Sequence, residues 1–142
     1  MKQLIYAISG YKNSGKTSII TSLIPLLTNT GLKVAVIKHD GHNFEGDVPG
    51  TDSFKAKQAG AYATAVFSNN RVLINKDVND IDEQMLILAF PEADIILLEG
   101  FKNKNYPKYF CNYQKTQKDD YQKIFEHIMN LYNAIQDEET NA

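Results

Sequence analysis

The fold is decided by the octapeptide Gly10-Tyr11-Lys12-Asn13-Ser14-Gly15-Lys16-Thr17, which fits the pattern G-x-x-x-x-G-K-[S/T]. A continuous apolar run precedes it at residues 4–8, and the segment that follows it has apolar residues at helical spacing. An apolar run without alternation is typical of a parallel strand that is covered on both faces. The order of strand, glycine loop and helix therefore predicts a loop that binds phosphate.

Each position of this loop has a physical role in holding a phosphate chain. Gly10 and Gly15 allow backbone conformations that a side chain would block, so that successive amides can surround the β-phosphate. The N-terminus of the following helix directs further amides at the anion. Lys16 supplies a positive charge for the β- and γ-phosphate oxygens, and we expect the Thr17 hydroxyl to ligate the Mg²⁺ that bridges them. A glycine-containing turn with an exposed lysine is the structural alternative, and we expect the side chain of Lys12 to be solvated.

Composition limits the class of protein. A chain of 142 residues with a net charge of −2 predicts one domain over residues 1–142, with no general attraction to nucleic acid or to an anionic membrane. Arg71 is the only arginine, which limits any arginine-finger mechanism within the chain. The single cysteine, Cys111, excludes an intramolecular disulfide. Because the apolar runs are too short to span a bilayer and the N-terminus lacks a signal-peptide pattern, we expect a cytoplasmic protein.

The segments after the loop predict a β–α–β unit. We expect a helix over residues 16–29, with Gly31 as a left-handed stop, and Pro25 causing either a kink or two shorter helical pieces. Residues 33–37 are a second continuous apolar run. Two strands joined by a helix in this way are parallel, with a right-handed crossover. The phosphate loop and the end of the second strand are therefore expected at the same edge of a sheet.

A polar, glycine-rich segment over residues 38–50 leaves this edge and is too long for a plain connector. In an open parallel sheet, ligands bind outside the carboxyl ends of the strands. We therefore expect this segment to supply the second half of the site, with Asp40 holding a Mg²⁺-bound water or orienting an attacking one. Asp47 and Asp52 are the other acidic candidates, and a solvated acidic loop is the structural alternative.

Two histidines in the same segment leave a second interpretation open. His39 and His42, together with nearby carboxylates, could form a transition-metal site. However, His-x-x-His in a flexible glycine loop lacks the helical or hairpin frame that usually fixes ligand geometry. We therefore favour a role for both histidines in holding the loop, or in contacting a phosphate or a partner.

In the middle of the chain, the pattern predicts a short helix over residues 51–60. It then predicts a hairpin of residues 62–67 and 71–74 around the turn Ser68-Asn69-Asn70, and a second helix over residues 81–90. Asp80 and Glu83 fit a capping box for the second helix, and Pro91 would end it. Near the C-terminus, the pattern predicts a short strand at residues 109–111, an apolar helical stripe over residues 121–135 that packs on the sheet, and fraying from Gln136 onward.

The second decisive stretch is an apolar run at residues 95–98 that ends in the carboxylate of Glu99. This arrangement resembles a Walker-B strand with glutamate in place of the usual aspartate, and we expect Glu99 to hold a Mg²⁺-coordinated water. A surface glutamate at a strand end is the structural alternative. Phe101 and Lys102 follow at once, and either could contact the nucleotide. Together the segments predict an α/β, three-layer P-loop NTPase fold with a mostly parallel central sheet and helices on both faces.

Three stretches together resemble one family, the molybdopterin-guanine dinucleotide biosynthesis adaptor proteins (MobB-type). The stretches are residues 10–17, the run Lys38-His39-Asp40-Gly41-His42 continued by residues 47–53 and 59–61, and Glu99-Gly100-Phe101-Lys102. The likeness covers roughly residues 1–108. It implies a GTP-binding, Mg²⁺-dependent protein of low intrinsic GTPase activity. It also implies a homodimer formed by sheet extension that helps the guanylyltransferase attach GMP to molybdopterin, with contacts to molybdopterin-bearing proteins as a further expectation.

The same resemblance implies which residues form the site. Nucleotide and Mg²⁺ would be held by residues 10–18, Asp40 and Glu99, including Asn13, Ser14 and Ser18; Lys38, His39, His42, Asp52 and Lys102 would line the nucleotide site or the partner surface. The preference for GTP over ATP rests on this resemblance alone, because Asn75-Lys76-Asp77 is one residue too short for a guanine-reading string.

Three functions remain open from the sequence. The first is an adaptor with weak GTPase activity, which fits the lack of a recognisable catalytic glutamine or arginine finger. The second is a kinase of a small metabolite, with Asp40 as the base and the loop after the second strand as the acceptor pocket. The third is a nucleotide-regulated scaffold without turnover.

Overall fold

The computed structural model describes residues 2–41, 44–112 and 120–141. The chain divides into two compact units, one of residues 1–39 with 83–142 and one of residues 40–82. Each unit is described below by itself. The prediction of a single domain over residues 1–142 concerns how the two units fold together, and it stays a prediction.

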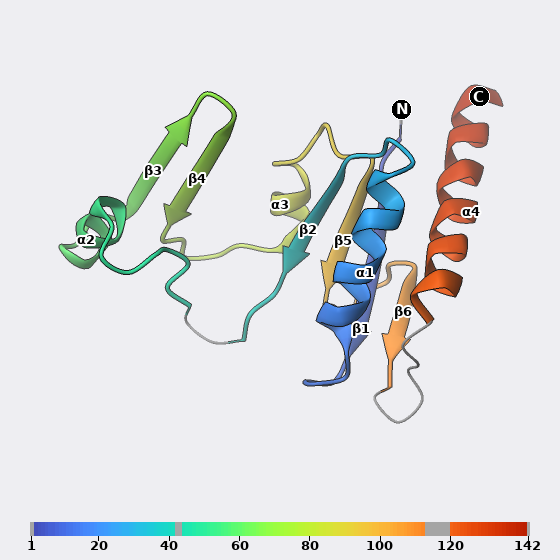
Figure 1. Ribbon diagram of the computed structural model, residues 1–142, viewed down its shortest axis with the longest axis horizontal. Coiled ribbons are helices and arrows are strands. Elements are labelled where there is room, and N and C mark those ends of the chain that lie inside the picture. Colours follow the sequence, from blue (N-terminus) through green and yellow to red (C-terminus); the bar gives the residue numbers. More distant parts are fainter. Residues whose placement is uncertain (1, 42–43, 113–119, 142) are drawn as a thin grey trace. The chain divides into compact units, whose positions relative to one another are not determined.

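The first unit is built on a four-stranded sheet in the order β2-β5-β1-β6 (Figure 1). Its strands are β1 (Leu4–Gly10), β2 (Val34–Lys38), β5 (Ile95–Glu99) and β6 (Lys108–Cys111). Every neighbouring pair in this sheet is parallel, as the β–α–β pattern predicted. Lys38 and Ile8 are both register partners of Glu99, so the carboxyl ends of three strands meet at one edge.

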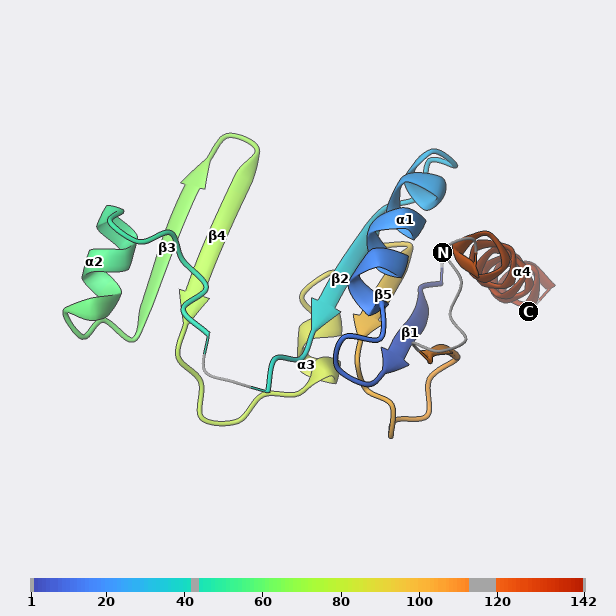
Figure 2. The same cartoon turned by 60° about the horizontal axis from the view of Figure 1, so that its bottom comes forward.

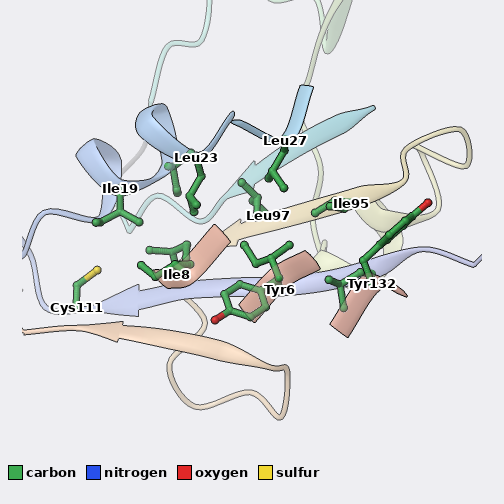
Figure 3. Packing of buried hydrophobic residues seen from close by; sticks show 13 residues of the cluster. Tyr6, Ile8, Ile19, Leu23, Leu27, Ile95, Leu97, Cys111 and Tyr132 are labelled. Atoms are coloured by element: carbon green, nitrogen blue, oxygen red, sulfur yellow. The ribbon is translucent and has the colours of Figure 1, made fainter. Parts of the chain in front are cut away.

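Helices cover both faces of this sheet. On one face lie α1 (Lys16–Thr28) and α4 (Asp120–Asn141), which run alongside each other in Figure 1 and are again neighbours in Figure 2, where α4 is seen nearly end-on. In Figure 3, Ile19, Leu23 and Leu27 of α1 point at Ile8 and Leu97 of the sheet, and these residues belong to one buried cluster. On the other face, Ile96 and Leu98 pack against the short helix α3 (Glu83–Ile87). The predicted mostly parallel sheet with helices on both faces is therefore confirmed.

The second unit consists of α2 (Asp52–Gln58) and an antiparallel hairpin of β3 (Ala63–Ser68) and β4 (Arg71–Lys76). The Thr51 hydroxyl caps α2 by accepting the amide of Phe54, as expected for a Thr at this position. Because Ser68 and Arg71 are register partners, the turn is the pair Asn69-Asn70. The predicted hairpin is confirmed, with its turn one residue shorter than expected.

Two local predictions were wrong, and the structure decides between the two alternatives given for the helix that contains Pro25. The capping box fails because α3 begins at Glu83 itself, whose buried carboxylate accepts a hydrogen bond from the Tyr106 hydroxyl at 3.1 Å. The C-terminal turns do not fray before residue 141, since the Gln136 amide donates to the Lys2 carbonyl at 2.7 Å. Helix α1 is one element through Pro25, not two pieces.

Among the residues that the structure describes, no helix is both long and apolar enough to span a membrane.

Candidate functional site

The loop between β1 and α1 has the backbone that its glycines predict. Gly10 and Gly15 adopt φ angles of 147° and 98°, and Asn13 adopts 61°. A Cβ on Gly10 would lie 2.6 Å from the carbonyl oxygen of Cys111 on the neighbouring strand β6. The loop therefore turns close against β6, in a conformation that a side chain at Gly10 would oppose.

The start of α1 offers hydrogen-bond donors that nothing on the helix itself uses. Gly15 is the N-cap and has no side chain to cap the first amides, and the first turn contains no acidic residue. The first amides of a helix have no intrahelical acceptor, and the helix dipole adds positive potential there. In addition, the buried Ser14 hydroxyl has no hydrogen-bond partner within the described residues. These donors fit a bound anion.

The Lys16 side chain folds back over the loop. Its ammonium donates to the carbonyl oxygens of Gly10 at 3.0 Å and Tyr11 at 3.4 Å. The structure thus brings the predicted charge to the mouth of the same loop as the amide donors. Phosphate oxygens carry more negative charge than these carbonyls and would be stronger acceptors for the ammonium.

Glu99 joins the end of β5 to the start of α1. Glu99 as a residue is 5% exposed. Its Oε1 accepts a hydrogen bond from the Thr17 hydroxyl at 2.7 Å, and the Lys38 ammonium lies 3.2 Å from Oε2. Sequence reasoning predicted the meeting of Thr17 with Glu99. It did not predict the pairing of Lys38 with Glu99, for which the only signal was that both residues end parallel strands. Hydroxyl and carboxylate oxygens are the ligands that Mg²⁺ prefers, so the donor set fits this ion.

The segment after β5 places Lys102 next to the phosphate loop. The Lys102 ammonium lies 4.7 Å from the centre of the Tyr11 ring, and that ring meets Phe110 edge-on at 5.5 Å. The segment is held by Lys108, whose ammonium donates to the carbonyls of Phe101 and Lys102 at 3.0 Å each. The sequence offered Lys108 only as one of the basic groups that a kinase lid would need; its contact with this segment was not predicted, because the acceptors are backbone atoms that a sequence does not place.

Of the remaining predicted residues, the structure brings His39 to the end of β5. The His39 amide donates to the Glu99 carbonyl at 3.5 Å, and the His39 ring lies 6.1 Å from the Phe101 ring. Asp40 belongs to the second unit, so its role at the Mg²⁺ site stays a prediction. His42 lies outside the described residues. Within residues 2–41, 44–112 and 120–141, no group of three or more His, Cys, Asp or Glu side chains could hold a metal ion.

The other acidic candidates have local structural positions in the second unit. Asp47 accepts the amide of the adjacent Val48 at 2.7 Å. Asp52 is the first residue of α2, where a carboxylate favours the helix dipole. Neither observation adds a reason to prefer these residues to Asp40.

Cys111 lies under the phosphate loop. The residue is fully buried, and burial raises the pKa of its thiol to about 11, against a lowering of that pKa by Lys16. Asp120 and Glu99 add smaller increases of the same pKa. Cys111 is therefore a packing residue in the core, and it supports the loop through the close approach of Gly10.

Comparisons with known proteins agree with the motifs. The family model described as molybdopterin guanine dinucleotide synthesis protein B (MobB) matches residues 5–133. The molybdopterin-guanine dinucleotide biosynthesis adapter protein of Haemophilus influenzae is 32% identical over 117 residues, covering 80% of this chain and 66% of that protein. The protein of the same name from Escherichia coli is 34% identical over 109 residues, covering 73% and 62%. The chain thus spans somewhat less than two thirds of the length of these relatives.

Solved structures agree with the fold. The crystal structure of Bacillus subtilis MobB has a TM-score of 0.62 at 30% identity, covering 84% of this chain and 72% of that one. A MobB protein homolog from Bacillus stearothermophilus has a TM-score of 0.68, covering 92% of this chain and 98% of that one. Its identity is 17%, so this second likeness concerns the fold alone.

Proposed function

The chain belongs to the molybdopterin guanine dinucleotide synthesis protein B (MobB) family, and from this premise we propose that it is a GTP-binding adaptor with weak GTPase activity. It assists the attachment of GMP to molybdopterin in the biosynthesis of the guanine dinucleotide form of the molybdenum cofactor. Two of its relatives are named as adapter proteins, which favours this function over a metabolite kinase.

The contact between Thr17 and Glu99 carries the proposal. The Thr17 hydroxyl donates its hydrogen to Glu99, so the lone pairs of its oxygen remain available to a metal ion. A Thr directly after Lys16 and an acidic residue at the end of a neighbouring strand are the two protein contacts that Mg²⁺ needs in a P-loop site. Bound Mg²⁺ would neutralise charge on the phosphate chain.

The other residues have complementary roles in this proposal. The amides of residues 10–18, together with the Ser14 hydroxyl, bind the phosphates, and Lys16 balances their charge. Asp40 and Glu99 hold Mg²⁺-bound waters. His39, His42 and Lys102 contact the nucleotide or the partner enzyme.

Slow turnover follows from the residues available for catalysis. Fast hydrolysis by P-loop proteins requires a positioned glutamine and an arginine finger. The only arginine of the chain, Arg71, lies at the start of β4 in the second unit, which supports an adaptor whose GTP serves a partner. GTP in place of ATP rests on the family membership, because Asn75 lies within β4 and its amide donates to the Glu45 carbonyl.

The partners proposed for this chain are a molybdopterin guanylyltransferase, a second copy of the chain and molybdopterin-bearing proteins, in the cytoplasm. The hairpin supports the second copy, because Phe67, Val72 and Ile74 are all more than half exposed. An exposed apolar patch of this kind is typical of a surface that binds protein. Sheet extension at an edge of the hairpin would bring a second copy next to this patch.

A calorimetric titration with GTP in the presence of Mg²⁺ tests the proposal. We expect wild-type protein to bind, the Lys16→Ala variant to bind about 100-fold more weakly because a charge-assisted contact is lost, and the exposed Lys123→Ala variant to bind as wild type. Equal affinity of the Lys16→Ala variant would remove the basis for the proposed site. An ATP titration tests the base preference, and phosphate release from GTP, expected to be slow, tests the turnover.

A further inference from the structure

The ion pair between Lys38 and Glu99 has a consequence for metal binding at this site. Glu99 is buried, whereas the Lys38 side chain is 59% exposed. One carboxylate oxygen accepts the Thr17 hydroxyl and the other faces the Lys38 ammonium at 3.2 Å. Both oxygens of the carboxylate therefore have a partner within the protein.

A magnesium ion ligated by Thr17, with a bound water on Glu99, would act on this ion pair. The ion would bring two positive charges to a carboxylate that already pairs with an ammonium. The magnesium ion and the Lys38 ammonium would repel each other if both stayed at the Glu99 carboxylate. This repulsion is strong where water is excluded. The Thr17 contact is compatible with the metal because the hydroxyl donates to Glu99 and can ligate through its lone pairs. The Lys38 contact is not compatible with the metal in this way, because an ammonium group has no lone pair to offer.

We propose that Lys38 is a built-in competitor of magnesium for Glu99, so that it sets the magnesium concentration that nucleotide binding requires. The inference rests on the proposed function, since it assumes that a Mg²⁺-nucleotide binds at this loop. Because Lys38 is mostly exposed at the end of β2, its long side chain can move into water when the metal arrives, whereas the buried Glu99 cannot.

The position of Lys38 supports a competing role over a purely structural one. Lys38 and Glu99 are register partners on adjacent parallel strands, so their Cα atoms are fixed opposite each other by the sheet. The pair keeps a buried carboxylate neutralised until another cation replaces the ammonium, and leaving such a carboxylate unpaired would be costly. Two ligands that exclude each other reduce each other's affinity by the same factor.

Binding at a series of free magnesium concentrations tests this inference, with a non-hydrolysable GTP analogue as the probe. In the Lys38→Met variant we expect the magnesium concentration at half-saturation to fall about fivefold, the size of a modest coupling between sites. In the Lys38→Arg variant we expect it to rise, because the guanidinium binds a carboxylate through two hydrogen bonds. The matched control is Lys33→Met, an exposed lysine just before the same strand, with an unchanged midpoint.

The outcomes separate this inference from the proposed function. A midpoint that is unchanged or higher in Lys38→Met, while wild type binds and Lys16→Ala does not, would overturn the role of Lys38 and leave the nucleotide site standing. Wild-type protein that binds the analogue at no magnesium concentration would overturn both. If Lys38→Met loses stability through the unpaired Glu99, the Lys38→Arg variant keeps the charge, and an unchanged or lower midpoint in that variant would also overturn the competition.

Discussion

Strand β5 in the first unit and strand β4 in the second are built from similar apolar residues, yet they differ completely in burial. Residues 95–98 of β5 are fully buried between α1 on one face and α3 on the other. In β4, Leu73 is 45% and Ile74 is 65% exposed. The first unit therefore completes its core within the chain and fixes the candidate phosphate site. The hairpin keeps apolar side chains exposed, which is the surface proposed above for a partner.

The largest expected effect compares one leucine from each strand. Leu97→Ala should lower the free energy of unfolding by about 2–5 kcal/mol, because it leaves a cavity in a fully packed core. Leu73→Ala should lower it by less than about 1 kcal/mol in dilute protein, since little packing is lost at a half-exposed position. Urea denaturation of both variants measures the difference. Similar losses would show that the hairpin is as well packed as the central sheet.

The second prediction concerns the proposed homodimer. Phe67 is 81% exposed at the end of β3, and aromatic side chains at the centre of an interface contribute about 2 kcal/mol or more. Phe67→Ser should therefore weaken self-association about 30-fold and leave nucleotide affinity unchanged. Analytical ultracentrifugation measures the association, with Lys55→Ala on α2 as the exposed control. Unaltered self-association would assign the dimer contact to another surface.

A smaller effect is expected in how the free energy of unfolding depends on pH, because a buried tyrosine in the first unit and an exposed one in the second should contribute differently. The Tyr6 hydroxyl lies 2.9 Å from Nδ1 of His127; burial, with a smaller effect of Tyr109, raises the Tyr6 pKa to about 12. An unfolded tyrosine ionises near pH 10, so between about pH 10 and 12 the unfolded chain has lost a proton that the folded chain keeps. Stability that Tyr6 contributes fully below pH 10 is therefore lost as pH rises through this window.

The Tyr6→Phe variant isolates this contribution. Between about pH 9 and about pH 11, its free energy of unfolding should fall by about 1 kcal/mol less than that of wild type. The control is Tyr62→Phe, at an exposed tyrosine just before the hairpin, which should follow wild type. Parallel pH profiles for wild type and Tyr6→Phe would mean that Tyr6 ionises as easily in the folded protein as in the unfolded chain.

Much of the first unit could be predicted from local patterns in the sequence. The phosphate loop, the continuous apolar strands and the acidic end of β5 each depend on neighbouring residues, and the right-handed β–α–β rule brings the strand ends to one edge. The pairing of Lys38 with Glu99 and the contact of Glu83 with Tyr106 could not be predicted, because they depend on strand order and on packing between distant segments. Likewise, an apolar strand pattern in β4 indicates a strand but not what covers it.

The last prediction concerns the reactivity of one thiol and not the stability of the protein. Cys111 is fully buried, and burial raises its pKa to about 11, so at pH 8 only about one thiol in a thousand is the reactive thiolate. Alkylation by iodoacetamide should be at least about 100-fold slower in the folded protein than in urea. A Ser68→Cys thiol in a Cys111→Ser background, at the exposed end of β3, should react almost as fast as the unfolded chain. Gly10 turns directly against Cys111. Fast alkylation of the native thiol would therefore mean that β6 does not hold the phosphate loop in place. Slow alkylation at Cys111 with fast alkylation at position 68 would extend the contrast in burial from β5 and β4 to other strands of the same two units.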